Sequence, residues 1–262
     1  MTEVVDQATR DALLRELDEV GYCVIPGVLG RDEVAELREA IDRAAAEDDA
    51  AGTAQRYGPT NSNQRVWALL NRGEPFVRLA MHPLALEMVR ARLGPDILLS
   101  GLSANITAPG GDREIGRLHT DQGYLLEPWP YLLAMNVSWF IDEFTTENGA
   151  TLVVPGSHTS LTTPSSELAP SAPAQLTGPA GSMAVWDGRL HHATGLNRTK
   201  DRKRRGILAT YSPPFIRGQE NWCRSLRPEV LAAHPGLGAL TGFEEWRTLG
   251  GVNGPVGSGL NF

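Results

Sequence analysis

Hydrophobic spacing in the first part of the chain is typical of helices. Residues 6 to about 20 have an amphipathic pattern whose apolar stripe consists of Leu13, Leu14, Leu17 and Val20. The run YCVIPGV that follows predicts a short strand, which its Pro-Gly pair ends. A second helix is predicted to begin at an N-cap at Asp32, and the tract AAAEDDAAGT to end it in a solvated loop. Residues 75–93 predict another helix, which Gly94-Pro95 closes.

From residue 96 the pattern changes to short apolar or alternating segments. Gly, Pro, Asn and Asp separate these segments, so each predicts a strand bounded by turns; they are DILLSGLSANITA, YLLAMNVSWFID, ATLVVPGS, GSMAVWDG and RRGILATYS. Residues 162–181 are rich in Pro, Ser and Ala, which predicts a long surface loop. Helices followed by strands predict an α+β fold whose sheet closes into a sandwich or a barrel.

No internal repeat and no linker divides the chain, so we expect one domain over residues 1–262. Its expected parts are a helical N-terminal part (1–95), a strand-rich core (about 96–215) and a C-terminal extension (216–262). A chain of 262 residues is long enough to bury a substantial hydrophobic core.

Composition limits the partners and the location. The formal net charge of −7 argues against a nucleic-acid or anionic-membrane partner, because both favour a basic face. Cys23 and Cys223 are the only cysteines, which predicts neither a disulfide framework nor a CxxC metal pattern. The N-terminus lacks the apolar segment of a secretory signal, and no apolar run approaches the roughly 18 residues of a membrane helix. We therefore expect a cytoplasmic protein without a membrane partner.

Candidate chemistry begins in the stretch GRLHTDQGYLL, where one residue separates His119 from Asp121. Side chains at i and i+2 of an extended strand point to the same face, so this imidazole and carboxylate could share a cation. A metal site needs a further ligand, and the remaining histidines are His82, His158, His191, His192 and His234. His82 and His234 lie at predicted helix ends and His158 lies in the turn PGSH, so a structural role is expected for these three.

The pair His191-His192 follows a predicted strand, and neighbouring residues on a strand face opposite sides. One of the two can therefore join His119 and Asp121. Two imidazoles and one carboxylate occupy one face of an octahedron and leave three positions open, which is typical of non-haem Fe(II) oxygenases. The same set of ligands also serves catalytic zinc, so a zinc enzyme is the competing interpretation.

These residues lie within a longer pattern. The pieces LHTDQGY, ENGATLVVPGSH and GSMAVWDGRLHHATGLNRTKDRKRRGI correspond in order to H-x-D, NGA-x-x-x-x-PGSH and H-x-x-G-x-N-x-[ST] followed by an arginine. With them the sequence resembles the phytanoyl-CoA dioxygenase family of Fe(II)- and 2-oxoglutarate-dependent oxygenases, in particular members that tailor natural products. The resemblance implies a double-stranded β-helix, that is, a jelly-roll or cupin-like barrel, with the N-terminal helices packed on one sheet. It also implies Fe(II) as the metal and 2-oxoglutarate and O₂ as cosubstrates.

The resemblance places the ligand of H-x-x-G-x-N at His192, and so implies iron ligation and catalysis by His119, Asp121 and His192. Halogenating relatives carry Gly or Ala in place of the carboxylate. Because Asp121 supplies a carboxylate here, halogenation is not expected.

The resemblance also implies residues that bind 2-oxoglutarate. The family places a cation for the far carboxylate at the start of the strand after N-x-[ST], which here implies Arg204, with Arg205 or Arg202 as alternatives. A guanidinium suits this role because it offers two parallel donors and stays charged when it is desolvated. The rest of RTKDRKRR is expected to be a solvated turn. Thr151 and Arg65 match positions that contact 2-oxoglutarate in relatives.

The expected substrate is a small, largely apolar metabolite oxidised at an unactivated C–H bond, by hydroxylation or by desaturation, epoxidation or rearrangement. The large side chains proposed as pocket walls are Tyr124, Leu125, Trp129, Met135, Phe140 and Trp222. A small polar substrate such as an amino acid derivative is the alternative, and an acyl-CoA is less expected because no basic cluster stands ready for its phosphates. A ligand-binding jelly-roll protein without turnover is the alternative of another class. Relatives in metabolite pathways are often dimers, so a homodimer is kept as an option.

Overall fold

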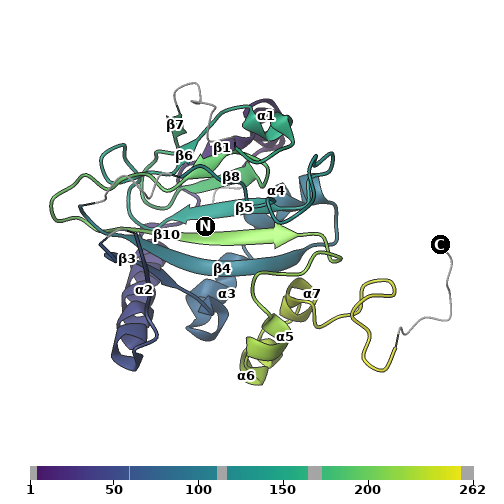
Figure 1. Cartoon of the computed structure of the whole chain (residues 1–262). Helices are drawn as coiled ribbons and strands as arrows, with labels where there is room; N and C mark the ends of the chain where they lie inside the picture. Colours follow the sequence, from purple (N-terminus) through teal and green to yellow (C-terminus); the bar gives the residue numbers. More distant parts are fainter. Residues whose placement is uncertain (1–4, 59, 111–116, 165–172, 255–262) are drawn as a thin grey trace.

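One large antiparallel sheet forms the centre of the protein in the computed structural model, which describes residues 5–58, 60–110, 117–164 and 173–254 (Figure 1). Its seven strands have the order β1-β8-β5-β10-β4-β3-β2, and a second sheet has the order β7-β6-β9. The strands are β1 (Tyr22–Ile25), β2 (Gln55–Tyr57), β3 (Asn63–Val66), β4 (Leu98–Thr107), β5 (Met135–Phe140), β6 (Leu152–Val153), β7 (Ala174–Gln175), β8 (Met183–Asp187), β9 (His192–Ala193) and β10 (Arg204–Ser212).

Helices precede and follow the strand-rich part. Among the described residues the α-helices are α1 (Gln7–Val20), α2 (Arg31–Ala51), α3 (Glu74–Ala80), α4 (Pro83–Leu93), α5 (Trp222–Ser225), α6 (Pro228–Ala233) and α7 (Leu237–Thr241), and the 3-10 helices are η1 (Leu69–Asn71) and η2 (Ser157–Ser160). None of the described helices has the length and apolar content that crossing a membrane requires.

Alternate residues of the central strands enter two different cores. On β5, Val137 and Trp139 belong to the larger hydrophobic cluster, which also contains residues of α1 to α4. Phe140 belongs to the smaller cluster, which contains Val153 of the second sheet. Because side chains alternate along a strand, this division means that the helices cover one face of the large sheet and the second sheet covers the other. Figure 1 shows β8, β5, β10 and β4 of the large sheet side by side, with α2 and α3 near β3 and β4.

This is the α+β arrangement that the sequence predicts, with two antiparallel sheets and helices packed on one of them. The two sheets do not close into a continuous barrel among the described residues. The strands β6, β7 and β9 are two residues long and pair with one another. His192 of β9 also forms an isolated bridge with His119, but none of the three strands pairs with a strand of the large sheet. The resulting shape is an open sandwich with the site between its layers.

The N-terminal helices differ in detail from their predicted bounds. Asp6 caps α1 by accepting a hydrogen bond from the Thr9 amide at 2.8 Å, as the pattern predicts for a helix from about residue 6. The N-cap of α2 is Gly30 and not Asp32, because Glu33 reaches back to accept from the Gly30 amide at 2.8 Å. The tract predicted to be a solvated loop continues α2 to Ala51, since its alanines favour helix and Ala44, Ala45 and Asp48 are buried.

The predicted helix at residues 75–93 is two helices. Pro83 has no amide hydrogen to donate into a preceding turn, so it ends that turn and stands at the start of α4. Gly94 ends α4 as predicted.

The part before residue 96, predicted to hold one strand, also contains β2 and β3, which extend the large sheet beyond β4. Their sequences, QRY and NQRV, have almost no apolar alternation, which is why the pattern did not indicate them. The predicted loop at residues 162–181 contains β7, and its residues 165–172 lie outside the described part of the chain, as do residues 255–262 of the C-terminal extension.

Candidate metal centre and its pocket

Three side chains from distant parts of the sequence converge between the two sheets. The imidazoles of His119 and His192 and the carboxylate of Asp121 each offer a ligand atom, and these atoms all lie within 4.8 Å of one another. The Nε2 atom of His192 lies 3.2 Å from Oδ2 of Asp121, and Nε2 of His119 lies 3.9 Å from Oδ1. These are the three residues that the resemblance to the family implied.

Backbone hydrogen bonds hold the three residues together. The His119 amide donates to the His192 carbonyl at 2.9 Å, and the His192 amide returns a bond of 3.0 Å. The Asp121 amide donates to the carbonyl of Gly188 at 2.9 Å. Residues 119–121 therefore adopt a single bridge and a turn rather than the extended strand expected for them, but the bridge still directs both side chains to one side.

Hydrogen bonds at the other ring nitrogens orient both imidazoles. Nδ1 of His192 lies 2.9 Å from the Leu190 carbonyl, and Nδ1 of His119 lies 3.2 Å from the Arg117 carbonyl. A carbonyl only accepts, so Nδ1 carries the hydrogen in each ring and Nε2 keeps a lone pair directed at the centre.

The pKa shifts of Asp121 and His192 indicate that a positive charge is stabilised between the side chains of the cluster. Burial alone raises the pKa of Asp121, but attraction to His192 and His119 and to Arg65 lowers it below its ordinary value. Burial alone lowers the pKa of His192, whereas the Asp121 carboxylate raises it above its ordinary value. Two lone pairs and a carboxylate that face each other this closely need a proton or a metal cation between them. The donor set therefore fits a divalent metal with open coordination positions.

The remaining histidines lie elsewhere and have structural contacts. Nε2 of His191 lies 2.9 Å from the Thr162 carbonyl, so this ring faces the neighbouring loop and not the metal cluster. His158 is buried and its Nε2 lies 3.1 Å from the Asp18 carbonyl. His82 packs edge-on against Trp139 at 5.0 Å, and His234 pairs with Glu74 at 3.0 Å.

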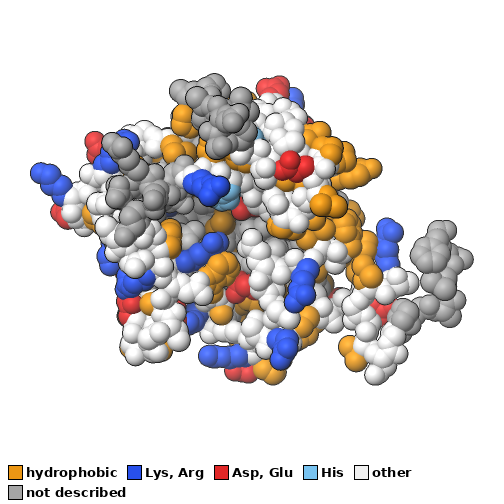
Figure 2. Space-filling view, in the orientation of Figure 1, with side chains coloured by type: hydrophobic (Ala, Val, Ile, Leu, Met, Phe, Trp, Pro, Cys, Tyr) orange, Lys and Arg blue, Asp and Glu red, His pale blue; other side chains and the backbone are white. Residues whose placement is uncertain are grey.

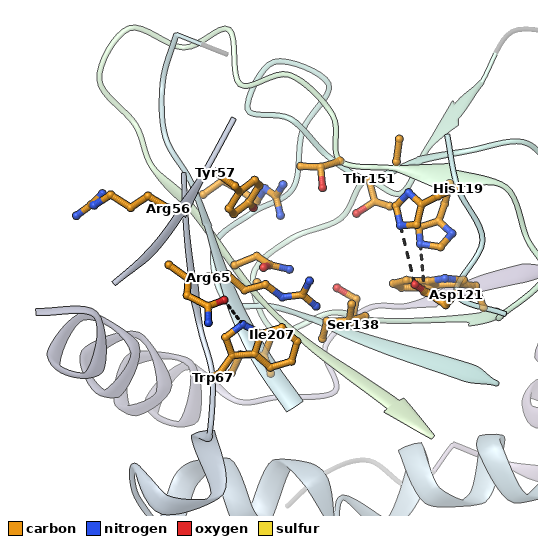
Figure 3. A pocket seen from close by; sticks show the side chains of 18 residues that line it. Arg56, Tyr57, Arg65, Trp67, His119, Asp121, Ser138, Thr151 and Ile207 are labelled. Atoms are coloured by element: carbon orange, nitrogen blue, oxygen red, sulfur yellow. Dashed lines mark hydrogen bonds and ion pairs between the residues drawn. The ribbon is translucent and has the colours of Figure 1, made fainter. Parts of the chain in front are cut away.

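A pocket of about 340 Å³ opens beside the cluster. Figure 2 shows a hollow on this face, with histidine atoms visible inside it and Lys or Arg side chains around it. The lining comes from both sheets and consists of Gln55, Arg56, Tyr57, Arg65, Trp67, Asn105, His119, Asp121, Ser138, Thr151, Trp186, His192, Ala193, Thr194, Arg204, Gly206, Ile207 and Leu208. In Figure 3, Arg65 and Ser138 lie across the pocket from His119, and Thr151 lies on the same side as His119.

Arg204 is a buried cation in the wall of this pocket. Its exposed fraction is 4%, one Nη2 hydrogen is donated to the Gly149 carbonyl at 2.7 Å, and the guanidinium lies 4.2 Å from the centre of the Phe144 ring. Its Nε has no hydrogen-bond partner among the described residues. Burial lowers the pKa of Arg204 to about 10, so the group remains charged at neutral pH. A buried guanidinium with a free donor fits a carboxylate ligand.

The neighbouring arginines point elsewhere. Arg205 forms ion pairs with Asp42 at 2.7 Å and with Asp142 at 3.0 Å, so it connects β10 to α2 instead of lying in the solvated turn expected for it. Arg202 is exposed and lies 3.9 Å from Glu147. Of the three arginines considered from the sequence, Arg204 is the one that lines the pocket.

Arg65 and Thr151 also line the pocket, as expected for residues near a cosubstrate. Arg65 donates from Nε to Ser103 at 3.1 Å and lies 4.2 Å from the centre of the Trp67 ring. Burial lowers its pKa. These contacts fix the guanidinium on the wall opposite His119 (Figure 3).

The large side chains predicted as pocket walls are not brought into this pocket. Phe140 lies behind the wall and stacks on Phe144 at 3.9 Å, whereas Trp222 is buried in the helical core and donates to the Leu99 carbonyl. Trp129 is buried and closes its own loop by a bond to Leu125, and Tyr124 is 56% exposed. Met135 lies in the helical core as well.

The aromatic lining comes instead from Tyr57, Trp67 and Trp186. Two of these belong to the hairpin region of β2 and β3, which sequence patterning did not identify. Trp67 lies two residues after Arg65, a residue already expected near 2-oxoglutarate, and this proximity could have indicated a place for Trp67 in the pocket.

Comparison with known proteins places this geometry in a family. The model of the phytanoyl-CoA dioxygenase family matches residues 17–206, which is more than half of the chain. The Aspergillus fumigatus protein Dioxygenase af480 is 36% identical over 219 residues, covering 82% of this chain and 70% of the relative. The structure is similar to that of SnoN, a non-heme alpha ketoglutarate dependent epimerase from nogalamycin biosynthesis, with a TM-score of 0.66, 22% identity and coverage of 86% of this chain and 87% of that one.

A second similar structure is HygX from Streptomyces hygroscopicus with nickel, 2-oxoglutarate and hygromycin B bound. Its TM-score is 0.65 at 18% identity, with coverage of 80% of this chain and 89% of that one. At this level of identity the two similar structures establish the fold alone. The match to the family model and the 36% identical relative establish family membership. The chain belongs to the phytanoyl-CoA dioxygenase family and is an oxidoreductase of the dioxygenase class.

Proposed function

We propose that the protein is an Fe(II)- and 2-oxoglutarate-dependent dioxygenase that oxidises a C–H bond of a small metabolite. The observation that carries this proposal is the three-donor cluster of His119, Asp121 and His192 in one pocket with a buried, partly unpaired Arg204. Bound together, ferrous iron and 2-oxoglutarate supply oxidation by O₂ with release of succinate and CO₂.

The residues of this chain hold and orient the reactants. His119, Asp121 and His192 would bind the metal through one face and leave the other side open toward the pocket. Arg204 would bind the far carboxylate of 2-oxoglutarate, aided by Thr151, and Arg65 would stabilise negative charge on the opposite wall. Trp186 packs edge-on against the His192 ring at 5.4 Å and excludes water from behind it.

The substrate we propose is a natural product with an apolar skeleton that carries hydrogen-bonding groups. Tyr57, Trp67, Ile207 and Leu208 offer apolar surface in the pocket, while Gln55, Asn105 and Ser138 offer polar groups. This mixed lining gives more support to a polar substrate than the amino-acid pattern did. Two similar structures support a natural-product substrate, because SnoN comes from nogalamycin biosynthesis and HygX has hygromycin B bound.

The first experiment supplies the purified protein with Fe(II), 2-oxoglutarate, O₂ and a set of candidate metabolites, and measures succinate. We expect succinate formation that depends on oxygen and rises with the right substrate. Asp121→Ala should remain folded by circular dichroism and lose this turnover. His191→Ala, next to the metal cluster in sequence but facing away from it, is the matched control and should retain turnover.

Other outcomes would support the competing interpretations. Turnover without oxygen and with bound zinc would indicate a hydrolase. Ligand affinity without succinate release would indicate a binding protein of the same fold. Undiminished turnover in Asp121→Ala would show that the reaction does not require the metal cluster.

A further inference from the structure

A buried side chain with no assigned role contacts the carboxylate of the metal cluster. Asn136, on the central strand β5, is 0% exposed, and its Nδ2 donates to Oδ2 of Asp121 at 2.8 Å. Its Oδ1 accepts from the hydroxyl of Thr210 on β10 at 2.8 Å. Thr210 and Asn136 are paired in the strand register, so the sheet itself holds the two side chains opposite each other.

A buried position in a central strand is unfavourable for asparagine unless its side-chain amide is hydrogen-bonded. Asparagine is depleted in strands, and a buried amide left without partners costs about 1–3 kcal/mol. Here both ends of the amide are satisfied, one by Thr210 and one by Asp121. The neighbours Val137 and Trp139 on the other face of β5 are purely packing residues of the helical core.

The bond also makes the two oxygens of Asp121 different. Oδ2 accepts from the buried Asn136 amide and lies 3.2 Å from Nε2 of His192, whereas Oδ1 lies 3.9 Å from Nε2 of His119. A donor on one oxygen restricts rotation of the carboxylate and disfavours binding of one cation through both oxygens.

We propose that Asn136, oriented by Thr210, is a positioning residue that fixes Asp121 as a single-oxygen ligand of the metal. This inference rests on the proposed function, since it assumes that the cluster binds a metal. Keeping the carboxylate to one coordination position leaves another free for the cosubstrates, which is what an oxygenase of this kind requires.

The test measures metal binding directly. Apoprotein is titrated with Fe(II) without oxygen and, in parallel, with Co(II), whose visible absorption depends on the number and arrangement of its ligands. We expect Asn136→Ala to weaken Fe(II) affinity about 10- to 100-fold, the usual range for losing a group that orients a ligand. We also expect a changed Co(II) spectrum at saturation, which a merely destabilising substitution would not produce.

Thr210→Val keeps the shape of the side chain and removes the hydroxyl, so it should shift both readings in the same direction by a smaller factor. Ser212→Ala is the matched control, because Ser212 is buried two residues further along β10 and its hydroxyl has no partner among the described residues. That variant should match the wild type in both readings. If Asn136→Ala does not fold, Thr210→Val against Ser212→Ala decides the question.

The outcomes separate this inference from the proposed function. A wild-type protein that binds neither ion would overturn the metal site as a whole. A wild-type protein that binds both ions, with the same affinity and spectrum in Asn136→Ala and Thr210→Val, would overturn the positioning role alone.

Discussion

The guanidinium of Arg204 shows that one position along a strand determines whether an arginine lines the pocket. Arg204 is buried, stacks on Phe144 and has no carboxylate within ion-pair distance among the described residues. Its neighbour Arg205 differs only by one position along β10, yet it faces α2 and pairs with Asp42. Alternation along the strand separates the two roles. The amino-acid sequence offered three arginines in one basic run, and the strand register distinguished them.

Replacing Arg204 with lysine tests this role. Arg204→Lys keeps the charge but loses the fork of donors and the stacking on Phe144. A lost charge-assisted hydrogen bond is worth about 1.5–3 kcal/mol, so KM for 2-oxoglutarate should rise roughly ten- to a hundred-fold while the protein stays folded. The measurement is succinate formation as a function of 2-oxoglutarate concentration.

Arg202→Lys serves as the control for Arg204→Lys, because Arg202 is an exposed member of the same basic run. Its KM should equal that of the wild type. Equal KM values in all three proteins would show that the cosubstrate carboxylate binds elsewhere.

At the scale of elements, two motif segments cross at the back of the pocket. Residues Asn148 and Asn197 form a bridge, and a Cβ on Gly149 would lie 2.5 Å from the Gly195 carbonyl oxygen. Gly149 also has a φ of +85°, and its carbonyl accepts the Arg204 hydrogen bond. The glycines of NGA and H-x-x-G are therefore required by a close backbone approach that positions the cation.

Alanine at this crossing should lower the free energy of unfolding far more than alanine at an ordinary left-handed position. Gly27 has a similar φ of +69°, and a Cβ on Gly27 would have no atom within 4 Å, so Gly27→Ala should cost about 1 kcal/mol of unfolding free energy. Gly149→Ala carries the same backbone cost and a clash besides, and should cost about 3 kcal/mol or more. Urea unfolding of the two variants measures the difference between their free energies of unfolding. Equal losses in the two variants would contradict the predicted clash at Gly149.

Elements were predictable where their spacing is regular. The helix α1 and the strands β4, β5, β8 and β10 follow the hydrophobic pattern of the chain. The short polar strands β2 and β3 do not, because pairing with β4 and not their own periodicity stabilises them. They nevertheless supply Tyr57 and Arg65 to the pocket.

Across the whole molecule, Glu220 connects the C-terminal extension to the sheet. Its carboxylate accepts from the Leu102 amide at 2.8 Å and from the Ala68 amide at 3.0 Å, and its own amide donates to the Ser100 carbonyl. Burial raises the pKa of Glu220 to about 7, against the lowering effect of these amides and of Arg65. The extension is thus held to β4 by a carboxyl group that titrates near neutrality.

This pKa predicts a pH dependence of stability. A carboxyl group whose pKa is higher in the folded state than its ordinary value of 4.5 binds its proton more tightly when folded. Between pH 4.5 and 7 the folded protein therefore holds more protons than the unfolded chain, and this group's contribution to the free energy of unfolding falls as pH rises. It is most favourable below pH 4.5 and lowest above pH 7.

Glu220→Gln removes this contribution, so the stability of the wild type relative to the variant should fall steadily from pH 4.5 to 7 and then level off. Urea unfolding at several pH values measures it. Glu229→Gln, at an exposed position of α6, is the control and should run parallel to the wild type. A Glu220→Gln curve that is also parallel would sink the prediction.

The single-domain organisation and the homodimer option remain predictions at this scale. The large sheet joins strands from β1 near the N-terminus to β10.

The sequence by itself predicted the family motifs, the α+β class, the strands with regular alternation and His119 and Asp121 as candidate donors. These follow from local spacing and residue types, whereas the choice of His192 over His191 came from the resemblance to the family. Tertiary structure alone decided which arginine enters the pocket, which aromatic rings line it, and that Asn136 contacts Asp121. The reason is that these contacts join residues far apart in the chain, through strand register and packing that no local pattern encodes.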